Sequence, residues 1–147
     1  NNMAHSWIHA AAALDLELTL ACPPGYGPEP AVLNAAKGRG GNIRVTEDPY
    51  SAARGADVVN TDVWASMGQE NEHSQRQRIF QPYQVNSRLM AEAAPDAIVM
   101  HCLPAHRGEE ISEDVLEGPQ SVVWEQTENK LHMHKAILDI LLGRQTE

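Results

Sequence analysis

The stretch "DAIVMHCLPAHRGEE" (residues 96–110) contains the pattern that decides the fold. Its first part, 96–103, is a short apolar run, which is typical of a strand buried on both faces of a parallel sheet. Pro104 follows that run and a polar loop begins. Because the functional loops of a parallel sheet lie at the carboxyl ends of its strands, we expect a site in the residues from His101 onward.

The rest of the chain alternates strand-like with helix-like segments. We expect helices at 3–13, 31–37, 49–55, 87–94 and 128–142, and further strands at 16–22, 42–47, 56–64 and 121–126. This alternation predicts an α/β domain with a doubly wound (Rossmann-like) parallel sheet and helices on both faces. Such a domain normally begins with a strand, whereas this chain begins on a helix that Asn1 or Asn2 can cap. We therefore expect the domain to lack its first strand.

Composition and charge narrow the class of protein. Hydrophobic residues make up 42% of the chain and charged residues 21%, as in ordinary globular proteins. The net charge of −9 argues against nucleic acids and anionic membranes as partners. No apolar run reaches the roughly 18 residues that a membrane helix needs. Two cysteines are too few for a disulfide framework, so we expect a reducing, cytoplasmic setting.

His101, Cys102 and His106 gather at the end of the strand at 96–103. A zinc site, a nucleophilic cysteine and a substrate pocket are all compatible with this cluster. Zinc needs three or four converging ligands, but neighbouring residues of a strand point to opposite faces, so we expect no metal. A structural role for Cys102 stays open, because cysteine is among the most buried residue types.

The segment "DVWASMGQE" (62–70) follows another predicted strand. A carboxylate at a buried strand end, such as that of Asp62, is costly unless it is paired or well hydrogen-bonded. Ser66 adds a hydroxyl, and Gly68 lets the backbone turn so that N–H groups near Met67 face a pocket. An acid beside backbone donors suits a zwitterionic amino acid. The alternative is that Asp62 caps a local turn. Dinucleotide, phosphate-loop and nucleophile-elbow motifs are absent from the sequence, so we expect no cofactor.

Five segments in order, "NNMAHS", "DVWASMGQE", "FQPYQVN", "HCLPAHRGEE" and "TENKLHMHKAIL", make the chain resemble the ornithine carbamoyltransferases. The resemblance covers nearly all of the sequence and is to the C-terminal, ornithine-binding half of these enzymes, within the aspartate/ornithine carbamoyltransferase family. The related aspartate enzymes have proline where Cys102 stands, so the cysteine favours ornithine.

The resemblance implies transfer of the carbamoyl group of carbamoyl phosphate to the side-chain amine of L-ornithine, giving L-citrulline and phosphate. Asn2 and the backbone at Met67 would hold the ornithine carboxylate. Asp62 and Ser66 would hold the α-ammonium group. Cys102 would orient the δ-nitrogen and accept or relay its proton, with His101 and Arg107 shaping its surroundings.

Carbamoyl phosphate would contact the carbonyls of Cys102 and Leu103, and Lys130 at a position where the family usually has arginine. Residues 1–147 would form the ornithine-binding domain alone, inactive without an N-terminal carbamoyl-phosphate domain, and the family is built on trimers. Two alternatives stay open. One is a carbamoyltransferase for another amine such as putrescine, although the "SMG" segment favours an α-amino acid. The other is a non-catalytic amino-acid-binding module.

Overall fold

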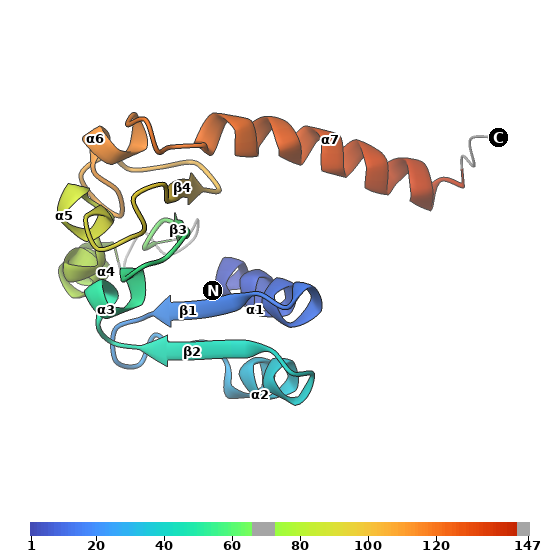
Figure 1. Ribbon diagram of the computed structural model, residues 1–147, viewed down its shortest axis with the longest axis horizontal. Helices are drawn as coiled ribbons and strands as arrows, with labels where there is room; N and C mark the ends of the chain where they lie inside the picture. The colour runs from blue at the N-terminus through green and yellow to red at the C-terminus, as the bar shows by residue number, and fades with distance from the viewer. Residues whose placement is uncertain (66–72, 144–147) are drawn as a thin grey trace.

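The computed structural model describes residues 1–65 and 73–143 (Figure 1). The elements are α1 (Asn2–Leu14), β1 (Glu17–Ala21), α2 (Pro30–Gly38), β2 (Asn42–Thr46), α3 (Pro49–Ala53), β3 (Val58–Thr61), α4 (His73–Phe80), the short 3₁₀ helix η2 (Gln81–Tyr83), α5 (Ser87–Met90), β4 (Ile98–His101), α6 (Glu113–Leu116) and α7 (Val123–Leu141). Strands alternate with helices through most of this order. The α/β class is therefore confirmed.

The strands form two parallel pairs. β1 pairs with β2, with Glu17 opposite Asn42, and β3 pairs with β4, with Thr61 opposite His101. Figure 1 shows α1 and α2 beside the first pair and α3 to α6 around the second. Within residues 1–65 and 73–143, no ladder joins the two pairs. Parallel strands are confirmed, while the expectation that the sheet lacks its first strand stays a prediction.

Local sequence signals fix where the helices begin. The Asn1 side-chain oxygen accepts hydrogen bonds from the N–H groups of Met3 (2.8 Å) and Ala4 (3.1 Å), so Asn1 rather than Asn2 caps α1. The Asn86 side chain caps α5 by accepting from the N–H of Leu89 at 3.1 Å. α5 ends at Met90 and is therefore shorter than the predicted helix at 87–94.

Each strand pair has its own hydrophobic core. Ile8 and Ala11 of α1 pack with Ala36 of α2 and Ile43 of β2 beside the first pair. The second pair packs around a larger set: Ala53, Val85, Leu89, Met90, Ala97, Val99, Ile111, Val115, Leu116 and Val123. This second core supports the end of β4, where the predicted site lies.

The predicted strand at 121–126 is wrong. The N–H of Val99 donates to the Gln120 carbonyl at 2.8 Å, and the N–H of Val122 donates to the Val99 carbonyl at 3.0 Å. Extended pairing is thus limited to one isolated bridge between Ser121 and Val99, and α7 begins at Val123. The residues after 124 include many good helix formers and show no strand-like alternation. The helix that they form begins two residues earlier, at the buried Val123.

α4 is a helix that the sequence patterns missed. It occupies part of a polar segment, and none of its residues from His73 to Phe80 is buried. Since a surface helix is normally recognised by an apolar stripe, this one gave little signal.

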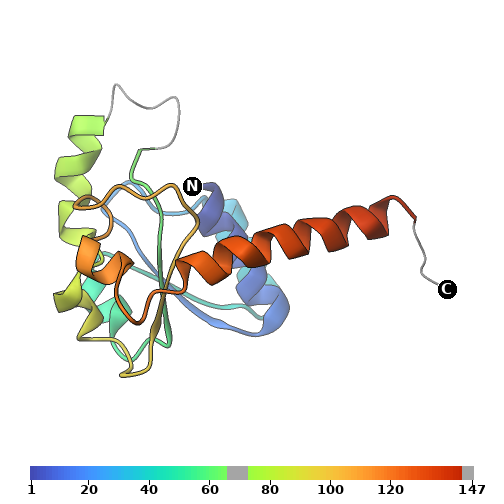
Figure 2. The same cartoon turned by 90° about the horizontal axis from the view of Figure 1, so that it is seen from above.

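α7 extends away from the rest of the chain in both views (Figures 1 and 2). Apolar side chains along this helix are exposed to solvent: Leu131 is 59% exposed, Leu138 56% and Leu141 75%. Of the described residues of α7, Val123 is buried. Among the residues that the structure describes, no helix combines the length and apolar character needed to cross a membrane.

Candidate functional site

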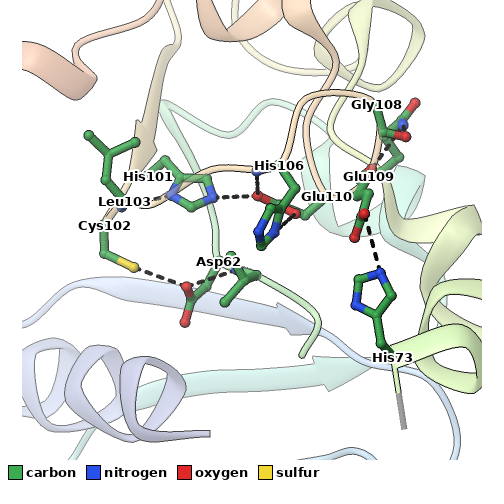
Figure 3. A network of polar contacts seen from close by, with 11 residues as sticks. Asp62, His73, His101, Cys102, Leu103, His106, Gly108, Glu109 and Glu110 are labelled. Carbon is green, nitrogen blue, oxygen red and sulfur yellow. Dashed lines mark hydrogen bonds and ion pairs between the residues drawn. The ribbon is translucent and has the colours of Figure 1, made fainter. Parts of the chain in front are cut away.

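Asp62 and Cys102 lie side by side at the carboxyl ends of β3 and β4. The parallel register places Thr61 opposite His101, so the next residue of each strand reaches the same edge. The Cys102 thiol donates a hydrogen bond to Oδ1 of Asp62 at 3.0 Å, and the N–H of Val63 donates to the same oxygen at 2.8 Å (Figure 3). Asp62 therefore caps its own turn and also contacts Cys102, while the binding of an amino acid by this carboxylate stays a prediction.

The environment of Cys102 keeps its thiol protonated. Burial is the main cause, and the hydrogen bond to Asp62 and the charge of Asp62 act in the same direction. The positive charge of Lys130 opposes them only in part, and the pKa of Cys102 rises from 9.0 to about 12. At neutral pH this side chain is consequently a hydrogen-bond donor rather than a thiolate.

Lys130 and Leu103 complete the surroundings of Cys102. The ammonium group of Lys130, on α7, donates a hydrogen bond to the Cys102 carbonyl. Leu103 has a φ of 56°, in the left-handed region that leucine rarely adopts. Its N–H group donates to Nδ1 of His101 at 2.8 Å, which holds this backbone in place. The structure thus brings together Cys102, Leu103 and Lys130, the residues that the resemblance implies for carbamoyl phosphate, and their contact with this substrate stays a prediction.

His101 and Glu110 form a buried pair behind this loop, and both side chains are 0% exposed. Because Nδ1 of His101 accepts a hydrogen bond from Leu103, its proton lies on Nε2, which donates to Oε1 of Glu110 at 3.0 Å. The N–H of His106 donates to the same oxygen at 2.7 Å. Burial opposes ionisation of Glu110, but these hydrogen bonds outweigh it and hold its pKa below the ordinary value.

Sequence reasoning gave Glu110 no role. The available signal was two acids close to two histidines in one loop, which does not say which acid is buried. Arg107, expected to shape the surroundings of Cys102, instead pairs with Glu117 where both side chains are partly exposed. Ser66 and Met67 lie outside the described residues.

Asn2 is exposed in the first turn of α1. In the amide orientation that satisfies both of its polar atoms, Asn60 of β3 accepts a hydrogen bond from the Trp7 indole at 3.2 Å. This contact ties α1 to the strand that leads to Asp62. Asn2 is therefore on the helix that flanks the site.

A family model described as "Aspartate/ornithine carbamoyltransferase, Asp/Orn binding domain" matches residues 1–141. The chain belongs to this family. Its relatives include the ornithine carbamoyltransferase of Desulfotalea psychrophila, which is 62% identical over 144 residues, 97% of this chain and 48% of the relative. The ornithine carbamoyltransferase of Syntrophus aciditrophicus is 57% identical over 143 residues, 97% of this chain and 47% of the relative.

Solved structures of the family superpose closely on this domain. The ornithine carbamoyltransferase from Pyrococcus furiosus has a TM-score of 0.89 at 47% identity, covering 97% of this chain and 47% of that one. The anabolic enzyme from Campylobacter jejuni has a TM-score of 0.92 at 37% identity, covering 99% and 49%. The chain therefore has the fold of carbamoyltransferases and spans about half the length of the relatives it matches.

In this member of the carbamoyltransferase family, the site offers four kinds of group. There is a carboxylate at Asp62, a neutral thiol at Cys102, an ammonium group at Lys130 and backbone carbonyls held in an unusual conformation at 102–103. A carboxylate can neutralise a substrate ammonium, and carbonyls can accept hydrogen bonds from an amide. The set suits a substrate that carries amines.

Proposed function

We propose that this chain is the ornithine-binding domain of an ornithine carbamoyltransferase, which makes L-citrulline and phosphate from carbamoyl phosphate and L-ornithine. The observation that carries the proposal is the 3.0 Å contact between the Cys102 thiol and Asp62 at the ends of two adjacent parallel strands. The family to which the chain belongs supports the choice of reaction, and the cysteine supports ornithine as the amine.

Asp62 binds the α-ammonium group of ornithine in this proposal. Its oxygen already accepts from the thiol and from the N–H of Val63, so it faces the space beside Cys102. A partly buried carboxylate provides the counter-charge that a desolvated ammonium needs. Ser66 assists at the same ammonium, while Asn2 and the backbone of Met67 hold the ornithine carboxylate.

Cys102 positions the δ-nitrogen and relays its proton. The attacking amine must be neutral, although in solution such an amine has a pKa of about 10.4. Because the thiol is protonated and points at Asp62, a relay moves two protons in one direction. Sγ accepts the proton of the δ-nitrogen while its own proton passes to the Asp62 carboxylate. The amine then attacks the carbonyl carbon of carbamoyl phosphate, the bond from that carbon to the phosphate oxygen breaks, and the leaving phosphate takes one of the two protons that remain on the nitrogen.

Carbamoyl phosphate binds at the carbonyls of Cys102 and Leu103, with Lys130 supplying positive charge. Lys130 already donates to the Cys102 carbonyl, so its ammonium is close to this position. Lysine carries the same charge as the family's arginine but lacks the planar fork of donors, so it holds a phosphate less rigidly.

An N-terminal carbamoyl-phosphate domain completes this site in the proposed enzyme. The exposed apolar side chains of α7, such as Ile137 (46% exposed) and Leu138 (56% exposed), support a partner that covers this helix. We place the complete enzyme in the cytoplasm as a homotrimer or a multiple of trimers, as the family resemblance implies. It uses no resident metal or other cofactor for the transfer.

The test is to join this chain to the carbamoyl-phosphate-binding half of the Desulfotalea psychrophila enzyme and to measure citrulline. The joined protein is expected to carbamoylate ornithine and not putrescine, and the chain by itself is expected to be inactive. Asp62→Asn is expected to abolish most of the activity. Asp57→Asn is the matched control, because Asp57 is an exposed acid just before the same strand.

Three results would contradict the proposal. Putrescine as the better substrate would make this a different carbamoyltransferase. A folded, joined protein without activity would favour the non-catalytic amino-acid-binding module. Equal activity in both aspartate variants would remove Asp62 from the site.

A further inference from the structure

We propose that His106, Glu109 and Glu110 bind a divalent transition-metal ion of the zinc class, with His73 as a fourth ligand. One ring nitrogen of His106 and one carboxylate oxygen of each glutamate all lie within 4.8 Å of one another. Figure 3 shows these side chains between the loop after β4 and the start of α4. This set of ligands is separate from Asp62 and Cys102.

Two of the separations between ligand atoms are close to those of an occupied site. In tetrahedral zinc coordination with bonds of about 2.1 Å, two ligand atoms are about 3.4 Å apart. Nδ1 of His106 is 3.7 Å from Oε2 of Glu110, and Nε2 of His73 is 3.4 Å from Oε1 of Glu109. Small side-chain movements would bring the two pairs together around one ion.

The buried carboxylate of Glu110 has an oxygen that lacks a hydrogen bond. Oε1 accepts from Nε2 of His101 and from the N–H of His106, whereas Oε2 has no hydrogen-bond partner among the described residues. Glu110 is 0% exposed, so water does not compensate this oxygen readily. A cation between Oε2 and His106 would satisfy it. The bond from His101 orients the carboxylate, as partners of metal ligands commonly do.

The ligand types select the class of metal. Imidazole nitrogens suit zinc, cobalt and nickel, whereas magnesium and calcium prefer oxygen ligands alone. Two carboxylates would neutralise the charge of a divalent ion. The His106 side chain is 49% exposed, so an ion can reach the site from solvent. From the sequence we expected no metal, because His101 and Cys102 point to opposite faces of a strand. The site proposed here departs from that expectation, and it shares only His106 with the set considered there.

The experiment is a titration of the full chain, freed of metal by a chelator, with zinc by calorimetry and with cobalt by visible absorption. One ion per chain and the absorption bands of tetrahedral cobalt are expected. His106→Ala and Glu109→Gln are each expected to weaken zinc binding at least about tenfold. His132→Ala is the matched control: His132 lies 3.7 Å from Glu128 on α7, a pair that belongs to no such cluster in the described part of the chain.

Circular dichroism checks that each variant is folded. If His106→Ala unfolds the chain, Glu109→Gln decides, because the Glu109 side chain is still 21% exposed and glutamine has nearly the same shape. Unchanged affinity in Glu109→Gln, or an equal loss in His132→Ala, would overturn the proposal. Loss of binding in Cys102→Ala would also overturn it, because the ion would then bind the thiol. Metal binding needs no substrate, so this result is independent of citrulline formation.

Discussion

The hydrogen bond between Cys102 and Asp62 makes a prediction about thiol reactivity that needs no catalysis. The thiolate is the form that reacts with iodoacetamide. With a pKa raised from 9.0 to about 12, Cys102 carries about a thousandfold less thiolate near pH 8 than an ordinary cysteine does. We therefore expect its alkylation to be about a thousandfold slower than that of a free cysteine, before any shielding by burial.

Replacing Asp62 separates the causes of this pKa. Burial is the largest cause and stays in place, while Asp62→Asn removes the negative charge that disfavours the thiolate. An asparagine amide can also donate a hydrogen bond to the thiolate. We expect the alkylation of Cys102 to become at least about tenfold faster near pH 8, yet to stay slower than that of a free cysteine.

The assay is a time course of alkylation, followed by mass spectrometry of the two cysteine peptides. Cys22 is the internal reference, because burial raises its pKa and Asp62 is not among the causes. Asp57→Asn is the control for a general change in charge. An alkylation rate of Cys102 equal to that of a free cysteine would refute the reasoning. So would an Asp62→Asn variant in which the rate is unchanged or lower.

Three further predictions concern stability and association. The pKa of Glu110 lies below its ordinary value of 4.5. The ionised carboxylate therefore stabilises the fold at pH values above 4.5, and this stabilisation is lost as the pH falls from 4.5 through the lowered pKa. Glu110→Gln should reduce this dependence of the melting temperature on acid pH and lower the free energy of unfolding by about 1–3 kcal/mol at neutral pH. A variant whose melting temperature keeps the full acid dependence would contradict this prediction. Gly118→Ala should lower the free energy of unfolding in urea by about 1–3 kcal/mol, because its Cβ would lie 2.5 Å from the Asp114 carbonyl oxygen, whereas Gly27→Ala meets nothing within 4 Å and should change little. Leu138→Ser should change the free energy of unfolding of the chain by less than about 0.5 kcal/mol but weaken its association with a separately supplied carbamoyl-phosphate domain. An unchanged association would count against that role of α7.

Much of the fold could be predicted because short-range patterns determine it. Asn1 and Asn86 are capping residues whose role is local. The apolar run at 96–103 contains β4, and the rule for parallel strand ends pointed to the loops that hold Asp62 and Cys102, although not to their hydrogen bond. That prediction depends on a periodic pattern and on one topological rule, both of which are visible in the sequence.

The remaining features depend on tertiary contacts that the sequence does not display. The run at 121–126 is apolar enough for a strand, but the helix that follows it extends back to Val123. Glu110 is buried because His101 and the N–H of His106 surround it, and its neighbour Glu109 has the same sequence character without that fate. The direction of Arg107 toward Glu117 is likewise set by the path of the loop.

The most direct test of the account is the steady-state kinetics of Cys102→Ala in the joined two-domain protein, at saturating carbamoyl phosphate and normalised to folded protein. We expect kcat to fall more than KM for ornithine rises, because the contact with the δ-nitrogen tightens as the proton leaves. Cys22→Ala should leave both constants near those of the parent protein. Near-normal kcat in Cys102→Ala would show that this thiol only fills space at the end of β4, and would contradict the proposed role of the site.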